Sequence, residues 1–228
     1  MLQHTLLTLA PALFSLAAVL VVMRQCRKPW SAPGRLFIWL MNRTHAGVTA
    51  WGLRHVTVRA DASVLEVGCG GGRTLRTLAG MCRHVDGIDY SPTSVAAAKR
   101  ANADLVAENR VVVQQASVSN LPFPDSSFDL VAAVETHYYW PAPIQDLREV
   151  LRVLKPGGTL LLIAETYKGE RSTAFLMIPM LLLQARYLTL DEHRDLLNQA
   201  GFADVAIDHE PRRGWMCGVA RRSPKVLA

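Results

Sequence analysis

A glycine-rich segment that follows a short apolar run limits the fold of this chain more than any other feature. The apolar residues 64–67 lead directly into Gly68–Gly72, and residues 73–79 have a helical pattern. Glycines allow a sharp turn after a strand, and the first turn of the helix behind them presents free N–H groups to a ligand. Ligands of open α/β sheets bind beyond the carboxyl ends of the strands. We therefore expect a strand, a ligand-binding loop and a helix over residues 64–79.

Strand-like and helix-like segments alternate along the chain from residue 61. The predicted strands are residues 64–67, 85–89, 111–115, 128–135, 159–164, 204–207 and 215–220. The predicted helices are residues 73–79, 96–109 (in a helix that starts at Ser91-Pro92), 144–154 and 191–200, the last of which ends at Gly201. This alternation predicts an α/β fold: a Rossmann-like, seven-stranded, mostly parallel sheet with helices on both faces. The last two strands are close enough in the chain to form an antiparallel edge hairpin.

The spacing within the glycine loop distinguishes between two kinds of cofactor. A dinucleotide site requires the pattern G-x-G-x-x-G, and its sixth position here is Arg73. The pattern present is E-x-G-x-G-x-G, from Glu66 to Gly72. Asp89 ends the second predicted strand, 23 residues after Glu66, where a carboxylate can accept hydrogen bonds from both hydroxyls of a ribose. A nicotinamide-dependent oxidoreductase is therefore the weaker alternative.

Four segments, in this order, resemble the motifs of the class I S-adenosylmethionine-dependent methyltransferases. They read VLEVGCGGGR (64–73), VDGIDYS (85–91), LPFPDSSFD (121–129) and LRVLKPGG (151–158). The resemblance covers residues 61–220. It implies a methyltransferase that uses S-adenosylmethionine as its cofactor, and we expect no metal.

The resemblance also implies roles for individual residues. Its cofactor-binding positions fall on Glu66, Gly68, Cys69, Gly70, Gly72, Asp89, Tyr90, Ser117, Val118 and Glu135. The glycines would line the methionine and ribose portion, with Glu66 near the amino group, while Asp89 would bind the ribose and Tyr90 would lie along the adenine. Ser117 stands where the family usually has an aspartate for the adenine amino group, so one carboxylate contact is missing. This departure keeps open the alternative of a non-catalytic scaffold that binds the cofactor.

The methyl acceptor is expected at the carboxyl end of the fourth predicted strand. Glu135, His137 and Tyr138 follow that strand and are expected to lie closest to the reaction. We predict His137 as a catalytic base because the imidazole pKa lies near neutrality, and Tyr138 as a residue that orients the acceptor or faces the sulfonium. The alternative is that the run 138–140 packs as a wall and His137 only lines the site. His193 and His209 are expected at the surface.

The apolar segment 174–183 lies where this family commonly carries a lid over the acceptor. An apolar lid indicates a small, hydrophobic acceptor, with a lipid-like molecule as one candidate, and the alternative is a core helix. Tyr167, just before this segment, is a further candidate for contact with the acceptor.

The first 60 residues predict a membrane anchor and a helical extension. Residues 5–23 contain no charged side chain, and a helix of that length covers ~28 Å, close to the hydrocarbon thickness of a bilayer. Arg24, Arg27 and Lys28 follow at once, which predicts a single-pass protein with its catalytic domain on the cytoplasmic side of the membrane. A cleaved signal peptide would need a basic start, and a buried core helix would need a polar stripe. We expect an anchor at 1–28, an amphipathic helical pre-domain at 29–60, over the domain mouth or on the lipid interface, and a methyltransferase domain at 61–228.

Charge and cysteine content disfavour several other classes. The formal net charge of +6 fits an anionic membrane surface, but no nucleic-acid-reading motif accompanies the scattered basic residues, so no nucleic-acid partner is expected. Cys26, Cys69, Cys82 and Cys217 lie far apart without C-x-x-C spacing, which argues against structural zinc and against a disulfide framework. The sequence thus predicts a membrane-anchored methyltransferase with a small, apolar acceptor.

Overall fold

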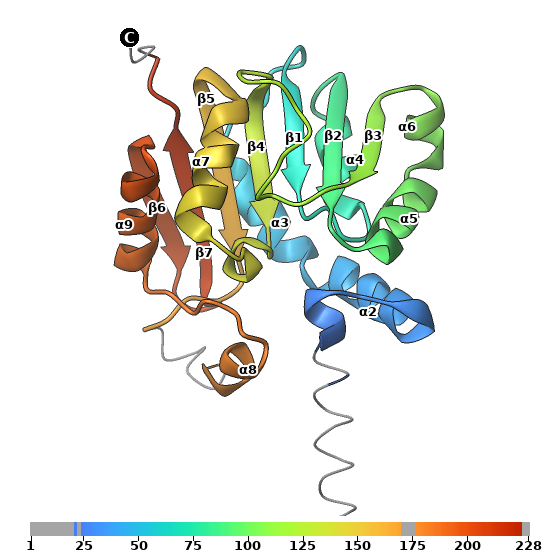
Figure 1. Ribbon diagram of the computed structural model, residues 1–228, viewed down its shortest axis with the longest axis horizontal. Coiled ribbons are helices and arrows are strands. Elements are labelled where there is room, and N and C mark those ends of the chain that lie inside the picture. Colours follow the sequence, from blue (N-terminus) through green and yellow to red (C-terminus); the bar gives the residue numbers. More distant parts are fainter. Residues whose placement is uncertain (1–20, 22–23, 170–176, 225–228) are drawn as a thin grey trace, which may run out of the picture.

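A single mixed sheet organises the part of the chain that the computed structural model describes, namely residue 21 and residues 24–169 and 177–224. Its strands are β1 (Ser63–Val67), β2 (His84–Asp89), β3 (Val111–Gln115), β4 (Phe128–Val134), β5 (Leu154–Ala164), β6 (Ala203–Glu210) and β7 (Trp215–Arg221). They lie in the order β3-β2-β1-β4-β5-β7-β6 (Figure 1).

The sheet is parallel from β1 to β5 and antiparallel at one edge. Neighbouring strands among β1–β5 run in the same direction, whereas β7 is antiparallel to both β5 and β6. Parallel neighbours need long crossovers, while only residues 211–214 separate β6 from β7, which suffices for a hairpin. The predicted mixed sheet with its antiparallel edge hairpin is confirmed.

Helices cover both faces of the sheet. The helices in the described part of the chain are α2 (Ser31–Thr44), α3 (Ala46–Gly52), η1 (Leu53–His55), α4 (Arg73–Ala79), α5 (Pro92–Ala101), α6 (Ala103–Ala107), η2 (His137–Tyr139), α7 (Pro143–Val153), α8 (Met177–Leu182) and α9 (Leu190–Ala200). Because side chains alternate along a strand, Val64 of β1 packs in one core with α3–α6, and Leu65 packs in a second core with α7 and α9. Both side chains are fully buried.

The helix predicted through residue 109 is interrupted at Asn102, between α5 and α6. The Nδ2 of Asn102 donates hydrogen bonds to the carbonyls of Gly72 and Ala98, each at 2.9 Å. An asparagine side chain that bonds to nearby backbone competes with the helical hydrogen bonds. The interruption therefore ties α5 to the glycine loop.

Strand β5 begins earlier than predicted. Leu154 pairs with Phe128 and Thr159 pairs with Leu130, so residues 155–158 form an irregularity within the strand and not a turn before it. Gly157 has a φ of 77°, and its N–H donates to the Arg222 carbonyl at 3.0 Å. A glycine in the left-handed region allows a bulged strand to continue in the sheet.

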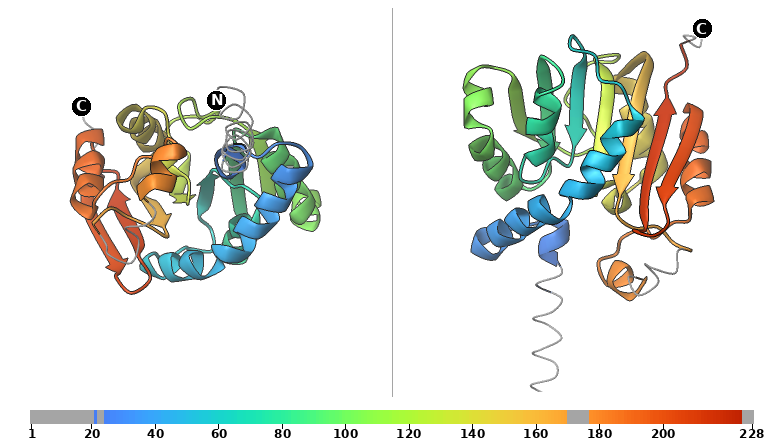
Figure 2. Two further views of the ribbon diagram at one scale, coloured as in Figure 1. Left: turned by 90° about the horizontal axis from the view of Figure 1, so that it is seen from below. Right: turned by 180° about the vertical axis from the view of Figure 1, so that it is seen from behind.

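The N-terminal helix α2 lies at the carboxyl ends of the strands, and α3 runs from there onto one face of the sheet (Figure 2). A Cβ at Gly71 of the loop would come within 2.3 Å of Asn42 Nδ2, so α2 packs directly on the glycine loop. The predicted anchor, residues 5–23, lies outside the described residues apart from residue 21. Among the helices that the structure describes, none combines the length and apolar character needed to cross a bilayer.

Candidate active site

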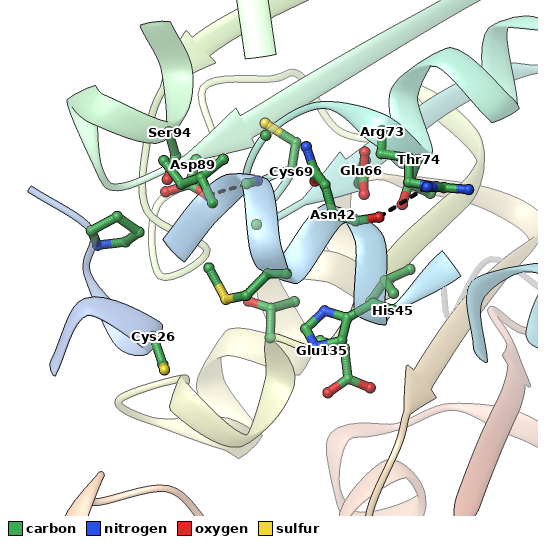
Figure 3. A pocket seen from close by; sticks show the side chains of 18 of the residues that line it. Cys26, Asn42, His45, Glu66, Cys69, Arg73, Thr74, Asp89, Ser94 and Glu135 are labelled. Atoms are coloured by element: carbon green, nitrogen blue, oxygen red, sulfur yellow. Dashed lines mark hydrogen bonds between the residues drawn. The ribbon is translucent and has the colours of Figure 1, made fainter. Parts of the chain in front are cut away.

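The glycine loop after β1 forms one wall of a pocket at the carboxyl edge of the sheet. Gly68 has a φ of 76°, and a Cβ there would lie 2.4 Å from Thr136 Oγ1, so only glycine lets the loop pass the end of β4. Gly68, Cys69 and Gly70 line this pocket, as predicted for a ligand-binding loop. We call it the loop pocket; its other lining residues include Ile38, Met41, Asn42, His45, Glu66, Asp89 and Glu135 (Figure 3).

Asp89, the last residue of β2, points its carboxylate at the loop. Its Oδ2 accepts a hydrogen bond from the Gly70 N–H at 2.9 Å (Figure 3), and its Oδ1 accepts one from the Ser91 N–H at 2.8 Å. Burial raises the pKa of Asp89, and these two donors oppose the rise. Each carboxylate oxygen can accept a second hydrogen bond, so Asp89 retains acceptor capacity for hydroxyls of a ligand.

Glu66 carries a buried carboxylate oxygen that lacks a partner. The residue is only 2% exposed, and its Oε2 has no hydrogen-bond partner among the described residues. Burial raises the pKa of Glu66 well above its usual range, although hydrogen bonds with Thr74 and with the Leu75 backbone oppose this effect. A buried acceptor without a partner costs roughly 1–3 kcal/mol. A cationic ligand group in the loop pocket would remove that cost.

A second pocket adjoins the first beyond Asp89. We call it the apolar pocket; it is lined by Val67, Ile88, Ala116, Ser117, Val118 and Trp140, and it shares Gly68, Asp89 and Tyr90 with the loop pocket. Its mainly apolar walls suit a flat aromatic ring. Ser117 and Val118, the two residues predicted near the adenine, both line this pocket, and the Ser117 Oγ accepts a hydrogen bond from the Ser119 N–H at 3.2 Å. The Tyr90 hydroxyl donates to the Arg27 carbonyl, which ties the N-terminal segment to this edge.

Gly72 lies behind the loop pocket and lines neither pocket. It precedes α4 with a φ of 79°, and a Cβ there would lie 2.8 Å from Ala98 Cα in α5. Its structural role is thus the close approach of α5 to the loop. This differs from the direct cofactor contact expected from the sequence.

Three titratable side chains from separate parts of the chain meet at the end of β4. Glu135 accepts hydrogen bonds from the Tyr138 hydroxyl at 2.6 Å and from the Glu165 N–H. His45, between α2 and α3, places its Nε2 3.4 Å from Glu165 Oε1. His45 and Glu135 both line the loop pocket, with His45 beside Glu135 in Figure 3. We call His45, Glu135 and Glu165 the acid–base cluster.

The pKa values within this cluster favour proton exchange near neutrality. Burial raises the pKa of Glu135 to about 7; the positive charge of His45 opposes that rise, and the negative charge of Glu165 adds to it. Burial alone would lower the pKa of His45, but the hydrogen bond to Glu165 and the negative charges of Glu135 and Glu165 outweigh it and raise this pKa. Groups with a pKa near the working pH are the most effective general acids and bases.

The same three residues are spaced as metal ligands could be. Each offers one ligand atom, and these atoms lie within 4.8 Å of one another. Both carboxylate oxygens of Glu135 already accept hydrogen bonds, and His45 pairs with Glu165. The polar atoms of the cluster thus already have hydrogen-bond or ion-pair partners, which supports an acid–base role for the cluster.

His137 does not reach either pocket. It is buried, and its Nε2 lies 3.0 Å from Nε2 of His193, while its Nδ1 has no partner among the described residues. Burial, followed by the charge of His193, lowers the pKa of His137 well below its usual range, so the ring is neutral. The prediction that His193 is a surface residue is wrong, because it is only 3% exposed in this pair; His209 is exposed as predicted.

Two members of the acid–base cluster were not predicted from the sequence. Glu165 directly follows β5, and the carboxyl ends of parallel strands meet at one edge, so its position offered a usable signal. His45 precedes the domain by 16 residues and had no such signal. Tyr139, named in the sequence only under the alternative of a packed wall, lines both pockets, whereas Tyr138 donates a hydrogen bond to Glu135 and lines neither.

Comparison with known proteins finds methyltransferases among those that this chain resembles. Residues 65–162 match the family model described as a methyltransferase domain. A protein of Mycobacterium tuberculosis strain H37Rv, named a probable S-adenosylmethionine-dependent methyltransferase, is 34% identical over 155 residues, which cover 65% of this chain and 53% of that protein. The 2-methyl-6-phytyl-1,4-hydroquinone methyltransferase 1 of Oryza sativa subsp. japonica is 31% identical over 160 residues, covering 68% and 46%. The chain thus spans about half the length of these curated relatives.

A solved structure supports the fold. A chain in the complex between the Haloferax volcanii Trm112 methyltransferase activator and a methyltransferase superimposes with a TM-score of 0.74. The match covers 85% of this chain and 96% of that chain at 24% sequence identity. At this identity the likeness concerns the fold alone.

Proposed function

We propose that this chain, which belongs to the class I S-adenosylmethionine-dependent methyltransferases, transfers a methyl group to a small, hydrophobic acceptor at a membrane. The observation that carries the proposal is the cradle formed by Gly68–Gly70, Asp89 and the unpartnered oxygen of Glu66. This cradle combines hydrogen-bond acceptors for a ribose with a buried carboxylate for an ammonium group. S-adenosylmethionine carries both groups.

Each part of the cradle has a function in holding the cofactor. Glu66 would accept a hydrogen bond from the ammonium group, and Asp89 would accept hydrogen bonds from the ribose hydroxyls. The apolar pocket would receive the adenine, with Ser117 in place of the aspartate usual in the family. When bound, the cofactor supplies a methyl group activated by an adjacent sulfonium.

Glu135 is the residue of this chain best placed to take a proton from an acceptor. Its pKa of about 7 lets a carboxylate oxygen accept a proton near neutral pH. The Tyr138 hydroxyl and the Glu165 N–H hold its two oxygens in place. The rest of the acceleration would come from alignment of acceptor and methyl group within the loop pocket.

The hydrophobic acceptor and the membrane location rest on three further observations. Residues 5–23 form an uncharged apolar segment of sufficient length to span a bilayer. Helix α8 exposes apolar side chains, among them Leu181 at 74%. The rice relative is named for an acceptor with a phytyl chain, which is a long hydrocarbon. An acceptor dissolved in lipid would account for all three.

Two alternatives remain distinguishable by experiment. A nicotinamide-dependent oxidoreductase would need a dinucleotide loop, and Arg73 occupies its last glycine position. A non-catalytic scaffold would bind S-adenosylmethionine without transferring its methyl group. Binding of a nicotinamide cofactor in place of S-adenosylmethionine would favour the first, and binding without turnover would favour the second.

Calorimetry with S-adenosylmethionine tests the cradle directly. Asp89→Ala is expected to weaken binding by at least tenfold, or about 1.4 kcal/mol, since it removes the acceptor for the ribose. Asp86→Ala is the matched control, because Asp86 lies on the same strand, bonds to His84 at 3.2 Å and lines neither pocket. Equal affinities of the wild type and Asp89→Ala would contradict the assignment.

The acceptor class needs a separate measurement. The chain is incubated with methyl-labelled cofactor and either a lipid extract or a soluble extract of its host cells. Label is expected in the lipid fraction. Label that appears only in the soluble fraction would contradict the hydrophobic acceptor.

A further inference from the structure

Exposed apolar side chains gather on two helices at one end of the molecule. They are Leu36, Trp39 and Leu40 on α2, and Met177, Ile178, Leu181 and Leu182 on α8. The exposed fractions reach 62% for Leu36 and 74% for Leu181, which is unusual for large apolar groups. Figures 1 and 2 show α2 and α8 at the same end of the sheet, although some 130 residues separate them in the sequence.

Helix α2 has two distinct faces. Ile38 and Asn42 face the domain and line the loop pocket. Leu36, Trp39 and Leu40 are exposed, and their spacing of three and four residues places them on one side of the helix. The inner face therefore closes the pocket, and the outer apolar face is left without packing in the described part of the chain.

A hydrogen bond connects the segments next to the two helices. Arg27, just before α2, lines both pockets, and its Nη1 donates a hydrogen bond to Gln184 Oε1 at 3.1 Å, just after α8. This contact links the segment that leads into α2 with the segment that follows α8 at the edge of the pocket. The exposed apolar side chains of both helices thus belong to one surface around the pocket mouth, which we call the mouth surface.

Positive charge is concentrated next to this surface. Seven of the 25 basic residues and none of the 19 acidic residues precede residue 61. Five of the seven, Arg24, Arg27, Lys28, Arg35 and Arg43, lie on or just before α2, whereas Arg59 pairs with Asp61 at the far end of β1. Lys28, Arg35 and Arg43 are exposed beside or on α2. The guanidinium of Arg43 also lies over the Trp39 ring, 5.4 Å from its centroid. Apolar, tryptophan-containing helices with basic residues are typical of the boundary between lipid headgroups and acyl chains.

We propose that the mouth surface lies in the headgroup region of an anionic bilayer, so that the loop pocket opens toward the membrane. This inference rests on the proposed function in one respect: an acceptor dissolved in lipid would enter the loop pocket from its membrane-facing side. The apolar side chains leave water, and the neighbouring basic residues meet lipid phosphates. A membrane anchor alone would hold the domain near the bilayer without setting its orientation. Contact of the mouth surface with lipid would direct the loop pocket toward the bilayer.

Quenching of tryptophan emission by lipids with brominated acyl chains tests the contact. The full chain is reconstituted in vesicles of phosphatidylcholine and phosphatidylglycerol. Leu181→Trp is expected to increase the quenched share of emission, and Trp39→Phe is expected to decrease it. Met81→Trp is the matched control, because Met81 is 40% exposed but lies just before β2, at the opposite end of that strand.

The charge contribution is tested in the same vesicles. Arg35→Glu combined with Arg43→Glu is expected to reduce quenching, as are high salt and the omission of phosphatidylglycerol. Arg83→Glu, an exposed arginine near Met81, should change nothing. Unchanged quenching in every mouth-surface variant would overturn the proposal, as would a concentration-dependent dimer that buries Leu181 in detergent. Calorimetry with S-adenosylmethionine on the same variants separates this outcome from a failure of the proposed function, since none of the substituted residues lines a pocket.

Discussion

Two glycines of the same loop should respond differently to the addition of one methyl group. Gly70 has a φ of 51° and Gly72 a φ of 79°, so alanine at either site must adopt the left-handed region. A Cβ at Gly70 would meet nothing within 4 Å, whereas at Gly72 it would lie 2.8 Å from Ala98 Cα and 2.5 Å from Asn102 Nδ2. Of these two glycines, only Gly70 lines the loop pocket. Substitution of each glycine by alanine therefore tests one role of the loop: Gly70 its contact with the ligand, and Gly72 its packing against α5.

The expected magnitudes follow from these two environments. Gly70→Ala should cost only the left-handed conformation, roughly 1–2 kcal/mol. Gly72→Ala should cost the same plus roughly 1–3 kcal/mol for a contact with backbone that cannot yield easily. In a chain of this size each kcal/mol lowers Tm by about 2–4 °C. For cofactor affinity the order reverses: Gly70→Ala should weaken S-adenosylmethionine binding at least about tenfold, while Gly72→Ala should leave the affinity of the folded fraction nearly unchanged.

Thermal unfolding and calorimetry on the full chain in one mild detergent measure both quantities. The wild type, Gly70→Ala and Gly72→Ala are compared at equal protein concentration. Equal losses of Tm would show that the predicted contact with α5 does not constrain the loop. A loss of cofactor affinity in Gly72→Ala as large as that in Gly70→Ala would refute the separation of roles.

Three further predictions concern the titratable residues. The pKa of Glu135 is about 7 in the folded chain against 4.5 in an unfolded one, so its contribution to stability is full below pH 4.5 and is lost as pH rises from there through 7. Relative to the wild type, Glu135→Gln should gain stability across that range, and a difference that is independent of pH would contradict this. Tyr138→Phe removes the 2.6 Å donor to Glu135, which should cost roughly 1–3 kcal/mol in chemical denaturation and shift the Glu135 titration to still higher pH. His193→Ala deprives the buried His137 Nε2 of its partner and should cost roughly 1–3 kcal/mol, yet calorimetry should find the cofactor affinity unchanged, since neither histidine lines a pocket.

Local sequence signals determined the order of elements and one wall of the site. The glycine loop, the strand that ends at Asp89 and the helix start at Ser91-Pro92 are all short-range features, and all lie where the sequence placed them; the Ser91 side chain accepts a hydrogen bond from the Ser94 N–H. The end of α9 at Gly201 was likewise predicted, and this glycine has the left-handed φ typical of a helix C-terminus. Such features depend on the backbone preferences of a few adjacent residues, so they can be inferred without knowledge of distant contacts.

The acceptor side of the pocket was decided only by tertiary structure. His45, Glu135 and Glu165 are up to 120 residues apart, and they meet because the junction between α2 and α3, which holds His45, lies at the ends of two strands that are neighbours in the sheet. Packing likewise turned His137 away from the pocket and toward His193, although its neutral-range pKa and its position after β4 made it the natural base. Sequence periodicity shows which face of an element is apolar, but not which distant side chain will lie against it. That choice depends on how whole helices pack on the sheet.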